Sequence, residues 1–306
     1  MADPDGGGPV AAIDCGTNTI KLLIGELPDV AVRETRLVRL GQGVDATGRL
    51  ADDALERTFA ALDEYAALVR EHGVTRIRFC ATSATRDAEN SEVFTDGVRA
   101  RLGVMPEVLS GAEEAALAFD GAVRHLREEP ELPVLVVDIG GGSTELIRGA
   151  SLGAPPSAAH SMDIGSVRLH ERHLRSDPPT MAEVSACVND IDRHLDACPV
   201  SPARAATVVG VAGTVTSVAA GVLDLAAYDR DAVDQAVLPL GDVHALVDRL
   251  VGMTVSERLE LPWLHPGRAD VIDAGALILS RVLRRTTVDS LLVSEADILE
   301  GIAWSV

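Results

Sequence analysis

One short pattern occurs twice in the sequence, and this repeat constrains the fold more than any other feature. Residues 10–14 and 134–138 each have the pattern of a buried strand that ends in an aspartate, followed by a glycine turn and a returning strand. The two aspartates, Asp14 and Asp138, lie 124 positions apart. This spacing predicts two related domains and is far longer than the unit of a solenoid repeat.

Strand and helix patterns alternate along the rest of the chain, which is typical of α/β layers. A chain of 306 residues accommodates about two domains of roughly 150 residues each. Pro130 and Pro133 interrupt any regular element between the two repeats. We therefore predict an N-terminal domain at 1–128, which opens with about eight disordered residues, and a C-terminal domain at 129–306 whose last helix can pack back on the first domain.

The charge balance argues against a nucleic-acid partner. The chain has a net charge of −20, and its 27 basic residues are arginines apart from a single lysine, Lys21. A groove for DNA or RNA needs clustered positive charge, and eight aromatic residues are too few for base-stacking platforms.

Other compositional features predict a cytoplasmic protein. We find no run of about 20 apolar residues and no basic and apolar leader at the start, so we expect no membrane segment and no export. The four cysteines form no C-x-x-C pair, and we expect them to be small buried apolar residues, with neither a zinc site nor a disulfide framework.

The second copy of the repeat carries the strongest chemical signal. Three consecutive glycines let the backbone approach a ligand closely and direct several amides at a phosphate oxygen. An aspartate at the end of the strand suits hydrated Mg²⁺, which binds through one or two carboxylates plus phosphate oxygens. A purely structural glycine-rich hairpin is the alternative. The candidate residues are Asp138, Gly140, Gly141, Gly142, Ser143 and Glu145.

Two further segments are candidate anion sites. One is the segment where a predicted strand leads through Gly213 into a helix, because the N-terminus of a helix attracts anions. Thr214 as an ordinary N-cap explains this segment equally well. The glycine turn of the repeat is present in both domains, so its two copies can contact a phosphate from two sides. The first copy of the repeat contributes Gly16, Thr17, Asn18 and Thr19.

A general base and a phosphate-binding cation also have candidates. Ser110 and Glu113 match a capping box at the start of a helix, which gives Glu113 a structural task. Glu114 has no such task and can accept a proton from an attacking water, although a solvated surface glutamate is the simpler interpretation. Arg86 lies in a predicted polar loop, 82–90, where its guanidinium suits a phosphate; pairing with a neighbouring carboxylate is the alternative.

Six segments of the chain follow one another in a recognisable order. They are Asp14-x-Gly-Thr-Asn-Thr19, Ala81-Thr-Ser-Ala-x-Arg86, Ser110-Gly-x-Glu-Glu-Ala115, Asp138-x-Gly-Gly-Gly-Ser-Thr-Glu145, Gly210-Val-Ala-Gly-Thr214 and Pro266-Gly-Arg-Ala-Asp270. Together they resemble the exopolyphosphatase and guanosine pentaphosphate phosphohydrolase family over nearly the whole chain. The resemblance implies two actin-like α/β domains of the hexokinase type with a cleft between them, in a short form without the extra helical domains of longer members.

The resemblance also implies an activity and its residues. The general base maps to Glu114, and the phosphate-contacting arginine maps to Arg86. The expected reaction is Mg²⁺-dependent hydrolytic release of terminal phosphate from inorganic polyphosphate. Removal of the 5′-γ-phosphate of guanosine pentaphosphate (pppGpp) and phosphate sensing without catalysis are the alternatives, and a homodimer is left open. The ligands of magnesium and phosphate map to Asp14, Asp138, Ser143 and Glu145.

Composition favours polyphosphate over the nucleotide. A guanine pocket needs apolar or aromatic walls, and we expect only Trp263, Phe79, Tyr65 and their few counterparts to be available to face a base. Trp263 stands where the family motif leads us to expect glycine, which predicts a reshaped surface there. Arg86 and Arg268 lie in or near the motifs, and arginines must supply most of the positive charge that a polyanion needs in this acidic chain.

Overall fold

A computed structural model describes residues 8–306, so the predicted disordered opening lies almost entirely outside the described residues. The chain forms two compact units. Unit 1 contains the described residues up to Ser110 together with Ile298–Val306, and unit 2 contains Gly111–Asp297.

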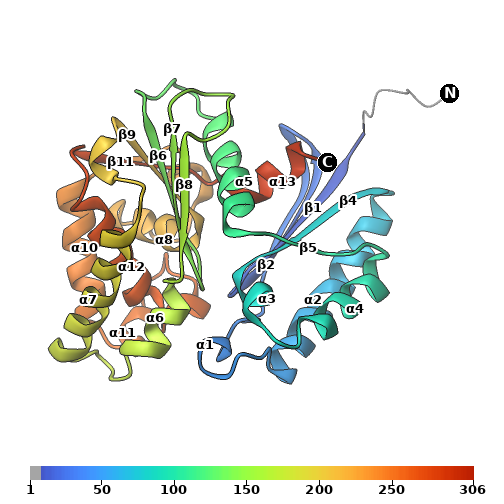
Figure 1. Ribbon diagram of the computed structural model, residues 1–306, viewed down its shortest axis with the longest axis horizontal. Helices are drawn as coiled ribbons and strands as arrows, with labels where there is room; N and C mark the ends of the chain where they lie inside the picture. Colours follow the sequence, from blue (N-terminus) through green and yellow to red (C-terminus); the bar gives the residue numbers. More distant parts are fainter. Residues whose placement is uncertain (1–7) are drawn as a thin grey trace. The chain divides into compact units, whose positions relative to one another are not determined.

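Unit 1 is built on a five-stranded sheet with the order β3-β2-β1-β4-β5. Strand β1 is buried along its whole length, and it pairs antiparallel with β2 and parallel with β4. In Figure 1, α13 lies on one face of this sheet, while α2 and α4 lie on the other. The strands are β1 (Val10–Cys15), β2 (Thr19–Glu26), β3 (Asp29–Leu37), β4 (Arg76–Ala81) and β5 (Glu107–Val108), and the helices are α1 (Val44–Thr47), α2 (Asp52–Glu71), α3 (Ser83–Asp87), α4 (Ser91–Leu102) and α13 (Ile298–Trp304).

The predicted amphipathic helix of unit 1 is α2, and its apolar side chains recur every three or four residues. Leu55, Leu62 and Val69 are buried in the core between α2 and the sheet. Tyr65, on the same face, donates its hydroxyl hydrogen bond to the carbonyl of Ile20 at 2.9 Å. This packing fixes the strand that follows the first glycine turn.

Unit 2 is built on a six-stranded sheet with the order β10-β11-β9-β6-β7-β8. Helix α5 packs on β6, β7 and β8, and α8 packs on β6 and β9; Figure 1 shows these two helices on opposite faces of the sheet. The strands are β6 (Val134–Ile139), β7 (Thr144–Gly149), β8 (Ala158–Met162), β9 (Thr207–Val211), β10 (Val237–Pro239) and β11 (Ser290–Val293), and the helices are α5 (Gly111–Arg124), α6 (Ser166–His173), α7 (Met181–Ala197), α8 (Ala212–Val222), α9 (Arg230–Val233), α10 (Leu240–Gly252), α11 (Val255–Leu259) and α12 (Ile272–Leu283).

The two sheets repeat one arrangement, which confirms the prediction of two related α/β units. The order β3-β2-β1-β4-β5 corresponds to β8-β7-β6-β9-β11, with two antiparallel pairs followed by two parallel pairs in each sheet. Asp14 pairs with Lys21 across the first hairpin, and Asp138 pairs with Glu145 at the equivalent place in the second. The internal repeat is therefore a structural duplication.

The structure differs from the sequence-based expectations in two places. The units divide at 110/111, whereas we predicted a boundary at 128/129, because α5 packs on the sheet of unit 2. The predicted polar loop 82–90 contains the short helix α3, whose Ser83 and Thr85 are buried. A short helix of small polar residues has no apolar stripe, so hydrophobic periodicity does not reveal it.

Two smaller expectations concern cysteines and membranes. Cys15, Cys80 and Cys187 are buried as predicted, while Cys198 is partly exposed. Within the described part of the chain, no helix has the length and apolar character needed to cross a membrane.

Candidate functional site

The glycine turn of unit 2 presents free backbone donors. The amide of Gly140 donates to the carbonyl of Ser143 at 3.0 Å and closes the turn between β6 and β7. Among residues 8–306, the amides of Gly141, Gly142 and Ser143 donate to no protein acceptor. Consecutive amides of this kind form a concave anion-binding surface, so the turn is suited to phosphate oxygens.

Three carboxylates gather beside this turn. Asp138 and Glu145 pair across the β6–β7 hairpin and are 8% and 1% exposed. Burial, and then the charges of Glu114 and Asp138, raise the pKa of Glu145 well above its usual range, while hydrogen bonds from Ser161 and Ser143 oppose this rise. The Ser161 hydroxyl donates to Glu145 Oε1 at 2.6 Å. The site therefore gathers three buried carboxyl groups next to the available amides.

The two glutamates at the start of α5 differ in burial. Glu113 is exposed, whereas Glu114 is only 7% exposed and interacts with Glu145. A solvated surface role is therefore wrong for Glu114. Its helix packs on β7 and β8, which places it with the carboxylates of the hairpin.

The turn of unit 1 has the same construction. The amide of Gly16 donates to the carbonyl of Thr19 at 2.9 Å, and the amides of Thr17 and Asn18 donate to no acceptor in the described chain. The Thr17 and Ser83 hydroxyls lie 3.0 Å apart, which joins the turn to the start of α3. Both copies of the repeat thus leave consecutive amides available to an anion.

Lys21 is a residue of the site region that our sequence analysis did not single out. Its Nζ lies 3.7 Å from Asp14 Oδ2, and both side chains are largely buried. Lys21 occupies the hairpin position that Glu145 occupies in unit 2, so the two hairpins differ in charge at this position. The chain's single lysine, placed across a predicted hairpin from Asp14, was the signal that would have revealed it.

Arg86 lies in α3 and is partly buried. Its Nη1 donates to the carbonyl of Leu109 at 2.8 Å, which anchors the side chain within unit 1. The neighbouring Thr85 is 1% exposed, and its hydroxyl has no partner among residues 8–306. A buried hydroxyl in this condition is uncommon and is often found where a ligand or water completes the site.

The segment around Gly213 differs from the simple N-cap that was the alternative for Thr214. Val211 is the N-cap of α8, and no side chain caps that helix. Ala212 has a φ of 67°, an uncommon conformation for a residue with a Cβ atom. Arg268 Nη1 donates to the Gly213 carbonyl at 3.0 Å, and a Cβ on Gly213 would lie 2.1 Å from the guanidinium. The absence of a side chain at Gly213 therefore leaves room for the close approach of this arginine.

The predicted metal ligands do not form a ready-made cage. Asp14 belongs to unit 1, and Asp138 and Glu145 belong to unit 2. Within the residues that the structure describes, no group of three or more His, Cys, Asp or Glu side chains has an arrangement that could hold a metal ion.

The aromatic residues that we expected to be available to a base lie in the cores. Trp263, Phe79 and Tyr65 are 3%, 1% and 0% exposed, so that expectation is wrong. Trp263 packs against Gly221 inside unit 2 and does not reshape the surface. Among the aromatic side chains of residues 8–306, only Tyr228 is exposed, and it donates a hydrogen bond to Glu295.

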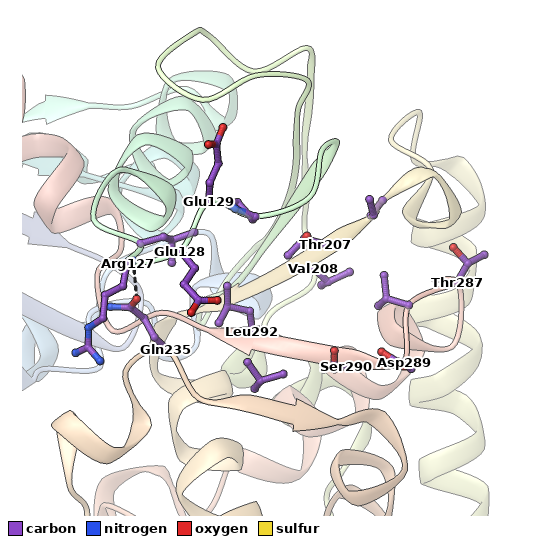
Figure 2. Close-up of a pocket in the computed structure, with 16 residues that line it drawn as sticks. Arg127, Glu128, Glu129, Thr207, Val208, Gln235, Thr287, Asp289, Ser290 and Leu292 are labelled. Atoms are coloured by element: carbon purple, nitrogen blue, oxygen red, sulfur yellow. Dashed lines mark hydrogen bonds between the residues drawn. The ribbon is translucent and has the colours of Figure 1, made fainter.

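A separate pocket of about 760 Å³ lies in unit 2 (Figure 2). It is at the N-terminal ends of the parallel strands, whereas the glycine turn follows the C-terminal end of β6. Thr207 and Ser290, the first residues of β9 and β11, line it. Within it, the amide of Arg127 donates to Gln235 Oε1 at 2.8 Å. The pocket contains none of the predicted site residues and is not part of the candidate site.

Comparisons of the sequence and the structure with known proteins identify relatives of this chain. The sequence profile described as the Ppx/GppA phosphatase family matches residues 23–306. Exopolyphosphatase 2 of Mycobacterium tuberculosis is 48% identical, and the match covers 97% of this chain and 98% of that protein. The crystal structure of an exopolyphosphatase-like protein has a TM-score of 0.94 at 45% identity, covering 97% of this chain and 98% of that one. The Ppx/GppA family member of Aquifex aeolicus has a TM-score of 0.81 at 32% identity, covering 97% and 96%.

Proposed function

Because this chain belongs to the Ppx/GppA phosphatase family, we propose that it is an exopolyphosphatase, which hydrolyses the terminal phosphoanhydride bond of inorganic polyphosphate. The observation that carries this proposal is the glycine turn of unit 2. Its available amides lie in the same hairpin as Asp138 and Glu145, and the buried Glu114 interacts with that hairpin. The full-length similarity to a protein named exopolyphosphatase supports the choice of substrate.

In the proposed reaction, the oxygen of a water molecule attacks the terminal phosphorus atom, and the bond to the bridging oxygen breaks. Glu114 orients the water and accepts its proton. The amides of Gly141, Gly142 and Ser143 hold the oxygens of the phosphoryl group, and their donors are already in place before substrate binds. The products are orthophosphate and a chain that is shorter by one unit.

In this proposal, unit 1 carries phosphate-binding groups of its own. Arg86 supplies a guanidinium, and the amides of Thr17 and Asn18 supply neutral donors. Because the protein is acidic overall, it needs local positive charge to bind a polyanion. The planar guanidinium group of arginine matches the geometry of phosphate oxygens.

The carboxylates of the site fit a divalent metal of the Mg²⁺ type. They are hard oxygen donors. Burial, and then the charges of Glu114 and Asp138, raise the pKa of Glu145, so a bound cation would stabilise its charged form. We assign Asp138 and Glu145 of unit 2 as the residues that would hold it; Asp14, the third ligand that the sequence suggested, lies in unit 1. When bound, the metal would neutralise phosphate oxygens and so lower the charge on the group under attack.

Polyphosphate fits the exposed side chains better than pppGpp does. A guanine ring needs a wall to stack on or a pocket with apolar sides. The chain buries most of its aromatic side chains, whereas a phosphate chain requires only positive charge and N–H donors. Removal of the 5′-γ-phosphate of pppGpp by the same groups is therefore the weaker expected activity.

This choice predicts a strong dependence of polyphosphate binding on salt. Raising NaCl from about 50 to 200 mM is expected to raise the KM for long-chain polyphosphate roughly tenfold, because several charged contacts are screened together. The KM for tripolyphosphate is expected to rise much less. Steady-state phosphate release at both salt concentrations measures the two values. An equal rise for both substrates would mean that only the terminal phosphates contribute to binding.

A further inference from the structure

The carbonyl side of the glycine turn in unit 2 is held by the start of α6. The amide of Ser166 donates to the Gly140 carbonyl at 3.0 Å, and the amide of Val167 donates to the Gly141 carbonyl at 2.9 Å. The first amides of a helix have no partner within the helix. Here the carbonyl groups of the turn accept hydrogen bonds from these amides, so the unpaired main-chain groups of the helix and of the turn find partners in each other.

Arg168 adds two donors to the same side. Its amide donates to the Gly141 carbonyl at 3.1 Å, and its side-chain Nε donates to the Gly142 carbonyl at 2.9 Å. Every carbonyl from Gly140 to Gly142 therefore accepts a hydrogen bond from α6. Because the carbonyl and the amide on either side of a peptide plane point in opposite directions, fixing these carbonyls also fixes the directions of the amides of Gly141, Gly142 and Ser143.

The close contact depends on Gly165, the N-cap of α6. A Cβ at this position would lie 2.4 Å from the carbonyl oxygen of Gly141 and 2.6 Å from the nitrogen of Gly142. Both are main-chain atoms of the turn, so they cannot move aside as a flexible side chain could. Any side chain here would push α6 and the turn apart.

Unit 1 holds its turn in the same way. The amides of Val38 and Arg39 donate to the Asn18 carbonyl at 3.0 and 2.9 Å, and the amide of Gly41 donates to the Thr17 carbonyl at 2.9 Å. These donors directly follow β3, just as α6 follows β8, and β3 and β8 are equivalent strands. The same device thus occurs in both copies of the duplicated fold.

We propose that Arg168 and the N-terminus of α6 are positioning residues that hold the amides of the Gly140–Gly142 turn in the direction needed to bind phosphate. The inference rests on the proposed function for the identity of the ligand. Arg168 acts here through its Nε donor to Gly142, and its positive charge is not the required property.

Two substitutions of similar length separate these properties. In Arg168→Gln, the side-chain amide nitrogen takes the place of Nε, so the donor is kept and the charge is lost. In Arg168→Met, both are lost. We expect kcat/KM for polyphosphate to stay within about twofold in Arg168→Gln and to fall about tenfold in Arg168→Met, the scale of a small displacement of a binding group. Arg175→Gln, at an exposed arginine just beyond α6, is the matched control for charge and should have no effect.

Hydrogen exchange of the ligand-free protein gives a readout that does not depend on activity. We expect faster exchange in peptides that cover 138–145 and 164–170 in Arg168→Met and Gly165→Ala, and wild-type exchange in Arg168→Gln. Circular dichroism checks that each variant is folded.

The outcomes are distinguishable. Equal loss of kcat/KM in the glutamine and methionine variants, with unchanged exchange, would show that Arg168 contributes charge and would overturn the proposal. Wild-type kcat/KM and exchange in the methionine variant would also overturn it. If the wild-type protein releases no phosphate from polyphosphate, the proposed function fails, and the exchange results still decide whether Arg168 positions the turn.

Discussion

Replacing Glu114 with glutamine is expected to lower kcat for polyphosphate about 10²-fold or more, the usual scale for removal of a general base. Glutamine has nearly the same shape but cannot accept the proton of the attacking water. The KM should change little, because the turn amides and the arginine that we propose to bind phosphate remain. The melting temperature should be unchanged or slightly higher, since the substitution removes one of the charges that raise the pKa of Glu145.

Glu113→Gln is the matched control for this experiment. Glu113 precedes Glu114 on the same helix and is exposed, so the same chemical change is made outside the carboxylate cluster. We expect less than about a threefold change in kcat, which is small beside the loss expected for a general base. Equal losses in both variants would contradict the assignment of Glu114 as the base.

The second large effect is expected for Asp138→Asn. An amide oxygen is a neutral and weaker ligand for a hard cation than a carboxylate, so the Mg²⁺ concentration for half-maximal activity should rise at least about tenfold. Thermal stability should be nearly unchanged, because Asp138 contributes repulsion to Glu145. The measurement is a magnesium titration of phosphate release from protein first treated with a chelator.

Asp163→Asn controls for the loss of one negative charge near this hairpin. Asp163 follows β8 and is exposed. Its magnesium titration should coincide with that of the wild type. Full activity of chelator-treated Asp138→Asn protein without added metal would contradict the role given to Asp138.

The sequence predicted the parts of this protein in which local pattern and tertiary structure agree. Buried β1 and β6, each ending near an aspartate, appear as continuous apolar runs, and their repetition predicted the duplicated fold. Strands β3 and β8 were not predicted. Strand β3 carries exposed and charged residues along much of its length, so it has no apolar pattern to detect.

The candidate site was predictable as motifs, but its construction was not. In the sequence, only the predicted capping box of Ser110 and Glu113 distinguished Glu113 from Glu114. In the structure the two differ directly, because Glu114 is buried and Glu113 is exposed. The holding of the glycine turn by α6 depends on backbone contacts between segments more than 20 residues apart. Such contacts leave no local signal, because main-chain donors and acceptors are the same in almost every residue.

The central claim is tested most directly by measuring phosphate release from long-chain polyphosphate, tripolyphosphate and pppGpp side by side, with one protein preparation and saturating Mg²⁺. We expect release of orthophosphate from the end of long-chain polyphosphate with the highest kcat/KM of the three, and weaker release from pppGpp. Efficient cleavage of pppGpp with no release from polyphosphate of any length would contradict the claim and identify the nucleotide as the substrate.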